Sequence, residues 1–340
     1  MGRPLNQFNA SEKILHHADK LDYFINGHKT LVVTELDLTN RCNNECPGCI
    51  GGRTDTSTLS VEQIDLIVDG LAALGNRGVI VSGGGEPLVS PHFVHAIERL
   101  ARAGMRIGVN SNGLALEGAA AEAIARYADY LRVSLDAATP ETYLQTHGMR
   151  PEHFERVLSN IRAFNELRAH SGSSVNFGLG FLTNAGYEAE MEPSVALARD
   201  LGVDFAQFRP YQDDTFNAIP EVERLRAAYE RPGFSVLASA QKYGHMADEE
   251  RGYSRCHGMF FSTVITADAR VFACLHYRQR AEYEIGQIGP ATLPEIWRSA
   301  RKWAVYESID CAGCPVRCRN DSFNRTLESL TDEVPDIEFM

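Results

Sequence analysis

Short runs of β-branched or apolar residues alternate with longer segments of helical period along most of this 340-residue chain. Such alternation is typical of repeated βα units around a parallel sheet. Six units are present, and six are too few to close an eight-stranded barrel. We therefore predict an α/β fold with an open, partial (β/α)6 TIM-like barrel, whose ligands bind at the C-terminal ends of the strands. The expected strands are 31–38, 78–82, 106–109, 131–135, 175–181 and 204–208.

Two of the intervening segments carry clear helical stripes. In the first, Ser60 and Gln63 have the spacing of a capping box, and Gly75 is expected to end the helix. The second runs over 153–167. The apolar residues of the two stripes are Val61, Ile64, Ile67, Val68, Leu71 and Leu74, and Phe154, Val157, Leu158, Ile161, Phe164 and Leu167.

The stretch NRCNNECPGCIGG, residues 40–52, places Cys42, Cys46 and Cys49 in the loop after the first expected strand. A structural zinc site needs four ligands and a disulfide framework needs pairs, so three thiols alone satisfy neither. A four-iron cluster held by three thiolates leaves one iron without a protein ligand. A zinc site completed by a distant ligand is the alternative.

The glycine-rich stretch SGGGEPL, residues 82–88, follows the second expected strand and opens onto the same face as the cysteines. Its glycines allow the backbone to approach a ligand closely, and Glu86 offers a carboxylate to an ammonium group. Beside the three cysteines, this loop points to a cofactor site.

Together these two motifs resemble the defining pair of the radical S-adenosylmethionine (radical SAM) superfamily, over about residues 31–235. The resemblance implies that Cys42, Cys46 and Cys49 hold a [4Fe–4S] cluster whose open iron binds S-adenosylmethionine. It also implies a 5′-deoxyadenosyl radical that abstracts unactivated hydrogen. The implied cofactor contacts are Gly84, Gly85, Glu86, Asn112, Ser134 and Arg150.

The other five cysteines are all C-terminal. Cys256 and Cys274 flank an expected β-hairpin that turns at 267–270, and CAGCPVRC follows at 311–318. This arrangement resembles the twitch domain, a shortened form of the SPASM extension, which binds an auxiliary [4Fe–4S] cluster. Ala269 stands where the family usually has glycine in the hairpin turn.

Five thiols complete one four-iron cluster, not two. Cys256, Cys274, Cys311 and Cys314 are the expected ligands. Cys318 could replace one of them, pack inertly, or act catalytically by donating hydrogen to a substrate radical. A zinc-ribbon layout is the alternative for this segment.

The formal net charge of −12 argues against a general nucleic-acid surface, which depends on Lys and Arg. The N-terminus lacks an apolar signal region, and no apolar run is long enough to cross a membrane. We therefore expect a cytoplasmic protein without nucleic-acid or membrane partners.

The motifs predict a radical SAM oxidoreductase acting on a small polar substrate of the amino sugar or aminocyclitol type, most simply a dehydrogenase. An external electron donor such as flavodoxin or ferredoxin is expected. An epimerase with a cysteine hydrogen donor, a peptide maturase and a non-catalytic zinc or iron–sulfur module are the alternatives. About thirty residues precede the first strand, too few for the leader-binding domain of many peptide maturases. At the expected active face, acidic residues would suit a cationic amino sugar, and the polar residues of RPYQDD include Arg209, Tyr211, Asp213 and Asp214.

The expected domain order is an N-terminal extension (1–30), the partial barrel (31–235), a small α+β twitch-type iron–sulfur domain (236–325) and a C-terminal tail (326–340).

Overall fold

A computed structural model of the chain describes residues 11–25, 31–49, 51, 55–211, 214–244, 251–315 and 318–330. Within these residues ten strands form a single sheet in the order β10-β9-β8-β1-β2-β3-β4-β5-β6-β7. Neighbouring strands from β1 to β7 are parallel. These seven are β1 (Val33–Asp37), β2 (Gly78–Ser82), β3 (Arg106–Ser111), β4 (Tyr130–Ser134), β5 (Asn176–Thr183), β6 (Phe205–Pro210) and β7 (Ser235–Ala238).

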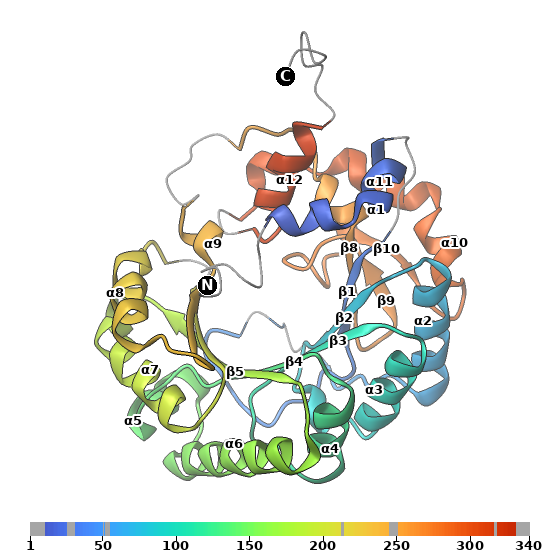
Figure 1. The fold of residues 1–340 in the computed structure, drawn as a ribbon. Coiled ribbons are helices and arrows are strands. Elements are labelled where there is room, and N and C mark those ends of the chain that lie inside the picture. The colour runs from blue at the N-terminus through green and yellow to red at the C-terminus, as the bar shows by residue number, and fades with distance from the viewer. Residues whose placement is uncertain are drawn as a thin grey trace.

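The helices that connect the parallel strands cover the outer side of the curved sheet (Figure 1). Because the sheet remains open, the predicted partial barrel is confirmed. The connecting helices are α2 (Val61–Ala73), α3 (Phe93–Arg102), α4 (Gly118–Tyr127), α5 (Pro140–His147), α6 (Pro151–Ser171), α7 (Met191–Asp200) and α8 (Ile219–Tyr229), with the 3₁₀ turns η2 (Pro87–Val89) and η3 (Ala185–Glu190).

The structure adds a seventh parallel strand that the sequence did not predict. Strand β7 pairs with β6 from Phe205↔Ser235 to Phe208↔Ala238. Its four residues are too few to display a period, so sequence patterning could not separate them from a loop. The strand crosses the predicted boundary at residue 235, which stays a prediction.

The predicted helix stripes form the outer core. Ser60 caps α2 through a complete capping box, in which its N–H donates to Gln63 Oε1 over 2.9 Å and its Oγ accepts from Gln63 N over 3.2 Å. Gly75 follows α2 with φ +64°. On α6, Phe164 meets Phe177 of β5 edge to face at 5.0 Å between ring centroids. Phe177 therefore points outward, and its neighbours in sequence point to the inner face.

Cys256 and Cys274 flank the predicted hairpin, formed by β8 (Ser262–Ile265) and β9 (Arg270–Phe272) and followed by β10 (Glu284–Gln287). Ala269 in its turn has φ +62°, the left-handed conformation that favours glycine. Strand β8 of the C-terminal segment pairs in parallel with β1 and continues the barrel sheet.

Further helices gather beside this edge of the sheet (Figure 1). The ring of Phe24, near the N-terminus, lies 5.3 Å from that of Phe261 between centroids. Helix α12 crosses the predicted boundary at residue 326, and the domain boundaries remain predictions. No helix in the described ranges is long and apolar enough to span a membrane. The additional helices and turns are η1 (Ser11–His16), α1 (Ala18–Ile25), α9 (Ala240–Gly244), η4 (His257–Phe260), η5 (Ala281–Tyr283), α10 (Leu293–Trp297), α11 (Ala300–Ser308), η6 (Cys311–Gly313) and α12 (Asp321–Glu328).

Candidate functional site

The loop after β1 carries the first three cysteines at the C-terminal edge of the parallel sheet. Cys42 and Cys46 are half-buried and Cys49 is exposed. Cys49 N donates to Cys46 O over 3.3 Å, which folds the loop back on itself. Burial, then Asp136, then the other two thiols raise the pKa of Cys46 to about 12. The three thiols are therefore electrostatic neighbours, as the predicted cluster site requires.

The cysteine loop is fixed by a contact within the β1–α2 connection and by contacts to the end of α5. Asn40 donates its Nδ2 to Asp55 Oδ1 over 2.8 Å, and Glu45 N donates to His147 O over 3.2 Å. A Cβ on Gly148 would lie only 2.6 Å from Glu45 O. The loop therefore rests directly on the end of α5.

The glycine-rich loop after β2 packs against the backbone of the cysteine loop. Gly85 N donates to Thr39 O over 3.0 Å, and Glu86 N donates to Arg41 O over 2.9 Å. A Cβ on Gly84 would overlap Asn40 Oδ1, and one on Gly85 would overlap the Arg41 carbonyl. The sequence suggested that these glycines admit a ligand, and the structure gives them the further task of admitting the cysteine loop.

Glu86 is 3% exposed and accepts three hydrogen bonds from the protein. Its Oε1 accepts from Leu88 N (3.1 Å) and Ser111 Oγ (2.8 Å), and its Oε2 accepts from Asn112 N (2.7 Å). A carboxylate has about four acceptor positions, so about one is left for a ligand ammonium. Burial raises the pKa of Glu86 to about 7, although these three bonds favour the charged form.

Asn112 links strand β3 to the cysteine loop. Its Nδ2 donates to Asn43 Oδ1 over 2.6 Å, while its Oδ1 accepts from Leu114 N over 2.9 Å. Four of the predicted cofactor contacts therefore lie directly against the loop that carries Cys42: Gly84, Gly85, Glu86 and Asn112.

Ser134 and Arg150 lie less centrally. The Ser134 carbonyl at the end of β4 accepts from His147 Nε2 over 3.2 Å. Arg150 is exposed and precedes α6 without a side-chain capping bond. Their cofactor roles stay predictions.

Asp136, two residues after Ser134, was not singled out from the sequence. It has φ +48°, and its Oδ1 accepts from Leu182 N over 2.7 Å. Its charge contributes to raising the pKa of Cys46 and Tyr211. An acidic residue just after a strand end was the only sequence indication of this position.

The acidic site suggested by the residues after β6 stays a prediction. Asp214 accepts from Phe216 N over 2.7 Å and so stabilises its own turn. Asp213 lies outside the described residues.

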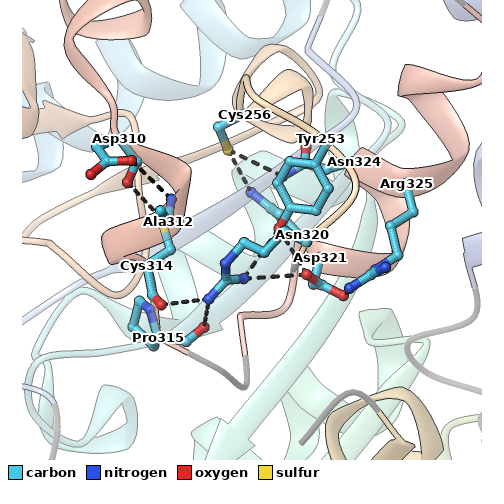
Figure 2. Close-up of polar contacts among 11 residues, drawn as sticks. Tyr253, Cys256, Asp310, Ala312, Cys314, Pro315, Asn320, Asp321, Asn324 and Arg325 are labelled. Carbon is cyan, nitrogen blue, oxygen red and sulfur yellow. Dashed lines mark hydrogen bonds and ion pairs between the residues drawn. The ribbon is translucent and has the colours of Figure 1, made fainter. Parts of the chain in front are cut away.

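Figure 2 shows Cys256 and Cys314 of the C-terminal group, with Asn320 and Asn324 of the α12 segment beside Cys256. Burial raises the pKa of Cys256 and Cys274 to about 11 and that of Cys318 to about 12. Cys318 contributes to the shift of Cys274, as does Cys256 to that of Cys318. Cys311 is the first cause of the raised pKa of Cys314. Cys318 therefore lies among the four predicted ligands.

Polar groups surround these thiols (Figure 2). Asn324 and Asn320 point their Nδ2 atoms at Cys256 Sγ, at 3.7 and 4.0 Å. Arg251 donates to Pro315 O over 3.0 Å and to Asp321 Oδ1 over 3.2 Å, which fixes the loop of Cys314 to α12. These thiols are hard to ionise, and amide groups donate to sulfur. Both features fit thiolate ligands of a cluster, because iron binding offsets the cost of deprotonating a buried thiol.

No three His, Cys, Asp or Glu side chains within the described ranges converge on a single metal ion. A four-iron cluster spreads its thiolates over separate irons, so this finding leaves the fit to such a cluster unchanged.

An ionic joint, which we define as Glu35, Asp37, Arg278 and Arg319, connects β1 to the C-terminal segment. Arg278 donates to Asp37 Oδ2 over 2.7 Å and to Glu35 Oε1 over 2.6 Å, and Arg319 donates to Glu35 Oε2 over 3.1 Å. Asp37 also accepts from the backbone of Gly84. The ionic joint therefore connects β1, which leads into the first group of cysteines, with Arg278 and Arg319, which follow Cys274 and Cys318 in the sequence.

Comparison with known families divides the chain into the same two parts. The sequence model of the "Radical SAM superfamily" matches residues 36–187, and that of the SPASM "Iron-sulfur cluster-binding domain" matches residues 256–318. The second match begins at Cys256 and ends at Cys318.

Several characterised or named proteins are similar to this chain. The GTP 3′,8-cyclase of Chlorobaculum tepidum is 26% identical over 303 residues, 83% of this chain and 88% of that protein. The probable GTP 3′,8-cyclase of Methanothermobacter thermautotrophicus is 33% identical over 132 residues, 37% of this chain and 41% of that protein. The dTDP-4-amino-4,6-dideoxy-D-glucose ammonia-lyase of Streptomyces venezuelae is 28% identical over 198 residues, 54% of this chain and 41% of that protein.

Two solved structures share the fold. Streptococcus suis SuiB bound to S-adenosylmethionine has a TM-score of 0.68 at 12% identity, covering 95% of this chain and 80% of that one. The enzyme anSMEcpe with bound AdoMet has a TM-score of 0.62 at 13% identity, covering 85% of this chain and 88% of that one. At this identity the likeness concerns the fold alone.

Proposed function

We infer that this chain, which belongs to the radical SAM superfamily and carries a C-terminal iron–sulfur cluster-binding domain of the SPASM type, oxidises a small polar substrate by removing hydrogen from it. The enzyme uses S-adenosylmethionine and [4Fe–4S] clusters. When bound, the first cluster and S-adenosylmethionine together supply a 5′-deoxyadenosyl radical that abstracts unactivated hydrogen.

We assign Cys42, Cys46 and Cys49 to the first cluster. The observation in support is the rigid frame around their loop, in which Gly85 and Glu86 donate backbone hydrogen bonds to it. Such a frame holds three thiols in place and leaves the fourth iron position to the cofactor, as positioning requires. Glu86 keeps about one free acceptor position for the amino group of S-adenosylmethionine.

The burial of Cys318 favours dehydrogenation over epimerisation. Cys318 is 8% exposed and interacts electrostatically with Cys256 and Cys274. A hydrogen donor must reach a substrate radical and then recover a proton from solvent and an electron from a reductant, whereas a thiol enclosed by other thiols suits a cluster ligand. A role for Cys318 as the catalytic hydrogen donor is therefore our second choice.

In dehydrogenation the substrate carbon loses a hydrogen atom to the deoxyadenosyl group, a neighbouring hydroxyl or amino group loses a proton to a base, and one electron leaves the substrate. The SPASM-type segment is the candidate electron acceptor, with flavodoxin or ferredoxin as the external carrier. These steps balance as a two-electron oxidation that consumes one S-adenosylmethionine.

Loss of ammonia from an amino sugar is a second candidate function. It is favoured by the similarity to the Streptomyces venezuelae ammonia-lyase, whose name specifies a nucleotide-linked amino sugar, over 54% of this chain. Such an elimination starts from the same hydrogen abstraction.

The test incubates anaerobically reconstituted protein with dithionite, S-adenosylmethionine and a panel of amino sugars, aminocyclitols, nucleotide sugars and short peptides, with mass spectrometry as the readout. Dehydrogenation gives a product two mass units lighter, with 5′-deoxyadenosine in equal amount. Ammonia loss gives a product lighter by one ammonia. A product of unchanged composition that takes up solvent deuterium would replace the proposal by epimerisation.

Cys318→Ala separates the two assignments of that residue. Loss of about four irons would make Cys318 a cluster ligand. If the unmodified protein takes up solvent deuterium, a Cys318→Ala variant with full iron content and cofactor cleavage but without that uptake would make Cys318 a hydrogen donor.

A further inference from the structure

Three cations on the inner side of the sheet form no ion pair with any described residue: Arg132 on β4, Arg209 on β6 and Lys242 on α9. The one hydrogen bond from the Arg132 side chain to a described residue runs from Nη1 to Gln207 Oε1 over 2.9 Å. The Nε atoms of Arg132 and Arg209 are buried and have no hydrogen-bond partner among the described residues.

Arg132 and Arg209 lie on the same face of the sheet, because Arg132 bonds Gln207 and Arg209 is two residues further along β6. Lys242 interacts electrostatically with both. Arg132 lies opposite Gly180, where an added Cβ would be 3.2 Å from its Cδ. Gly180 is on the face of β5 opposite to Phe177, which packs outward on α6. Burial and then Arg209 lower the pKa of Arg132, while burial, Arg209 and Arg319 lower that of Lys242. The cations are thus close enough to repel one another.

The acids that interact electrostatically with Arg132 are Asp136 and Glu35, and both have other hydrogen-bond partners among the described residues. Glu35 and Asp37 are held by Arg278 and Arg319 in the ionic joint. Asp136 accepts the backbone N–H of Leu182. All three cations are half-buried. Withdrawing cations from water without counterions is costly, so an arrangement of this kind is expected where an anion binds.

The cations occupy the region between the two groups of cysteines. At one end Arg132 interacts with Asp136, which in turn raises the pKa of Cys46. At the other end Lys242 interacts with Cys318. Next to Cys318, a small cavity is lined by His276 and Arg319. Both ring nitrogens of His276 are buried without a partner.

We propose that Arg132, Arg209 and Lys242 form a subsite for an oxyanion, a phosphate ester or a carboxylate, carried by the substrate. This inference rests on the proposed function, because it places the substrate inside the barrel, and it specifies the chemistry of that substrate. A guanidinium presents planar N–H donors that match two oxygens of either group, and an ammonium adds a point charge.

The subsite revises the kind of amino sugar that the sequence suggested. The overall charge of −12 allowed a cationic substrate, but the described interior of the barrel is locally cationic. A substrate bearing only an amino group would be repelled here, whereas an amino sugar that also carries phosphate or carboxylate would be held by its anionic end.

The test is calorimetric titration of the full-length, reconstituted protein with four probes: inorganic phosphate, pyrophosphate, D-glucuronate and D-glucosamine. We expect one anion class to bind and glucosamine not to bind. Binding of the phosphates without glucuronate assigns a phosphate ester, and the reverse assigns a carboxylate. Binding of glucosamine alone, or of no anion at millimolar concentration, overturns the proposal.

Arg132→Gln and Lys242→Met are expected to weaken anion binding by about 10- to 100-fold each, on the scale of lost hydrogen bonds to a charge. The matched control is Arg156→Gln on α6, where Arg156 is half exposed and pairs with Glu117 at 3.0 Å. Equal weakening by the control would overturn the proposal.

Arg132→Lys retains the charge and gives a partial loss, and it replaces Arg132→Gln if that variant does not fold. The amount of 5′-deoxyadenosine formed with dithionite separates the two proposals. Cofactor cleavage without anion binding would remove the oxyanion subsite alone, and anion binding without cleavage would remove the proposed function alone.

Discussion

Replacing Arg278 by methionine is expected to destabilise the protein strongly, because Arg278 is the centre of the ionic joint. Its side chain is 7% exposed, and those of Asp37 and Glu35 are 1% and 10% exposed. The variant fills a similar volume but donates no hydrogen bond to either carboxylate.

The size of the effect follows from what each acid retains. Glu35 keeps Arg319 at 3.1 Å, so its charge stays paired. Asp37 loses both contacts to Arg278, at 2.7 and 2.9 Å, and keeps only the backbone of Gly84. Leaving one buried charge uncompensated costs about 3–5 kcal/mol.

Arg270→Met is the matched control in the same segment. Arg270 pairs with Asp268 at 2.6 Å and with Glu284 at 3.4 Å, but all three side chains are 24–30% exposed. Solvent screening limits that loss to about 1 kcal/mol. Adding Asp37→Asn to Arg278→Met is expected to recover part of the stability, because it removes the orphaned charge.

The assay is urea unfolding of the anaerobically reconstituted variants, followed by circular dichroism at matched iron content. The expected difference between Arg278→Met and Arg270→Met is about 2–4 kcal/mol. A loss within about 1 kcal/mol of the control would refute the argument that this joint is an energetically isolated buried network.

Three further outcomes follow from the two cysteine groups and Glu86. Reconstituted protein is expected to bind about eight irons, and joint replacement of Cys42, Cys46 and Cys49 by alanine to leave about four; stoichiometric zinc without iron would contradict both cluster assignments. Gly85→Ala is expected to lose the first cluster, because its Cβ would overlap the Arg41 carbonyl, whereas Gly78→Ala, with its nearest contact at 3.9 Å, keeps both; equal iron contents would refute the packing argument. Burial raises the pKa of Glu86 to about 7, above that of an unfolded glutamate near 4.3. The folded state therefore binds this proton more tightly than the unfolded state. The free energy of unfolding is expected to fall as pH rises between these two values, by at most about 1.4 kcal/mol per pH unit. Glu86→Gln is expected to make that slope shallower in urea titrations, and an identical slope would show that other groups cause it.

The features that the sequence determined alone are local ones. The capping box of Ser60 and Gln63 lies within one helical turn, and the three thiols of Cys42, Cys46 and Cys49 lie within one loop. The alternation of strand and helix period predicted the open barrel, because each period expresses which side of an element is buried. The rule that ligands gather at strand ends then put the first two motifs on one face.

Features that join distant segments were decided only by the tertiary structure. Glu35 and Arg278 are 243 residues apart, and no periodicity in either segment indicates that they pair. The sequence also did not indicate that β8 pairs with a free edge of β1, because the two edges of a strand carry the same backbone groups. The inner cations on the strands, Arg132 and Arg209, are charged residues within mostly apolar strands. Which side of a strand such a residue occupies, and which charges share that side, depends on strand register and closure, which arise only when the whole sheet has formed.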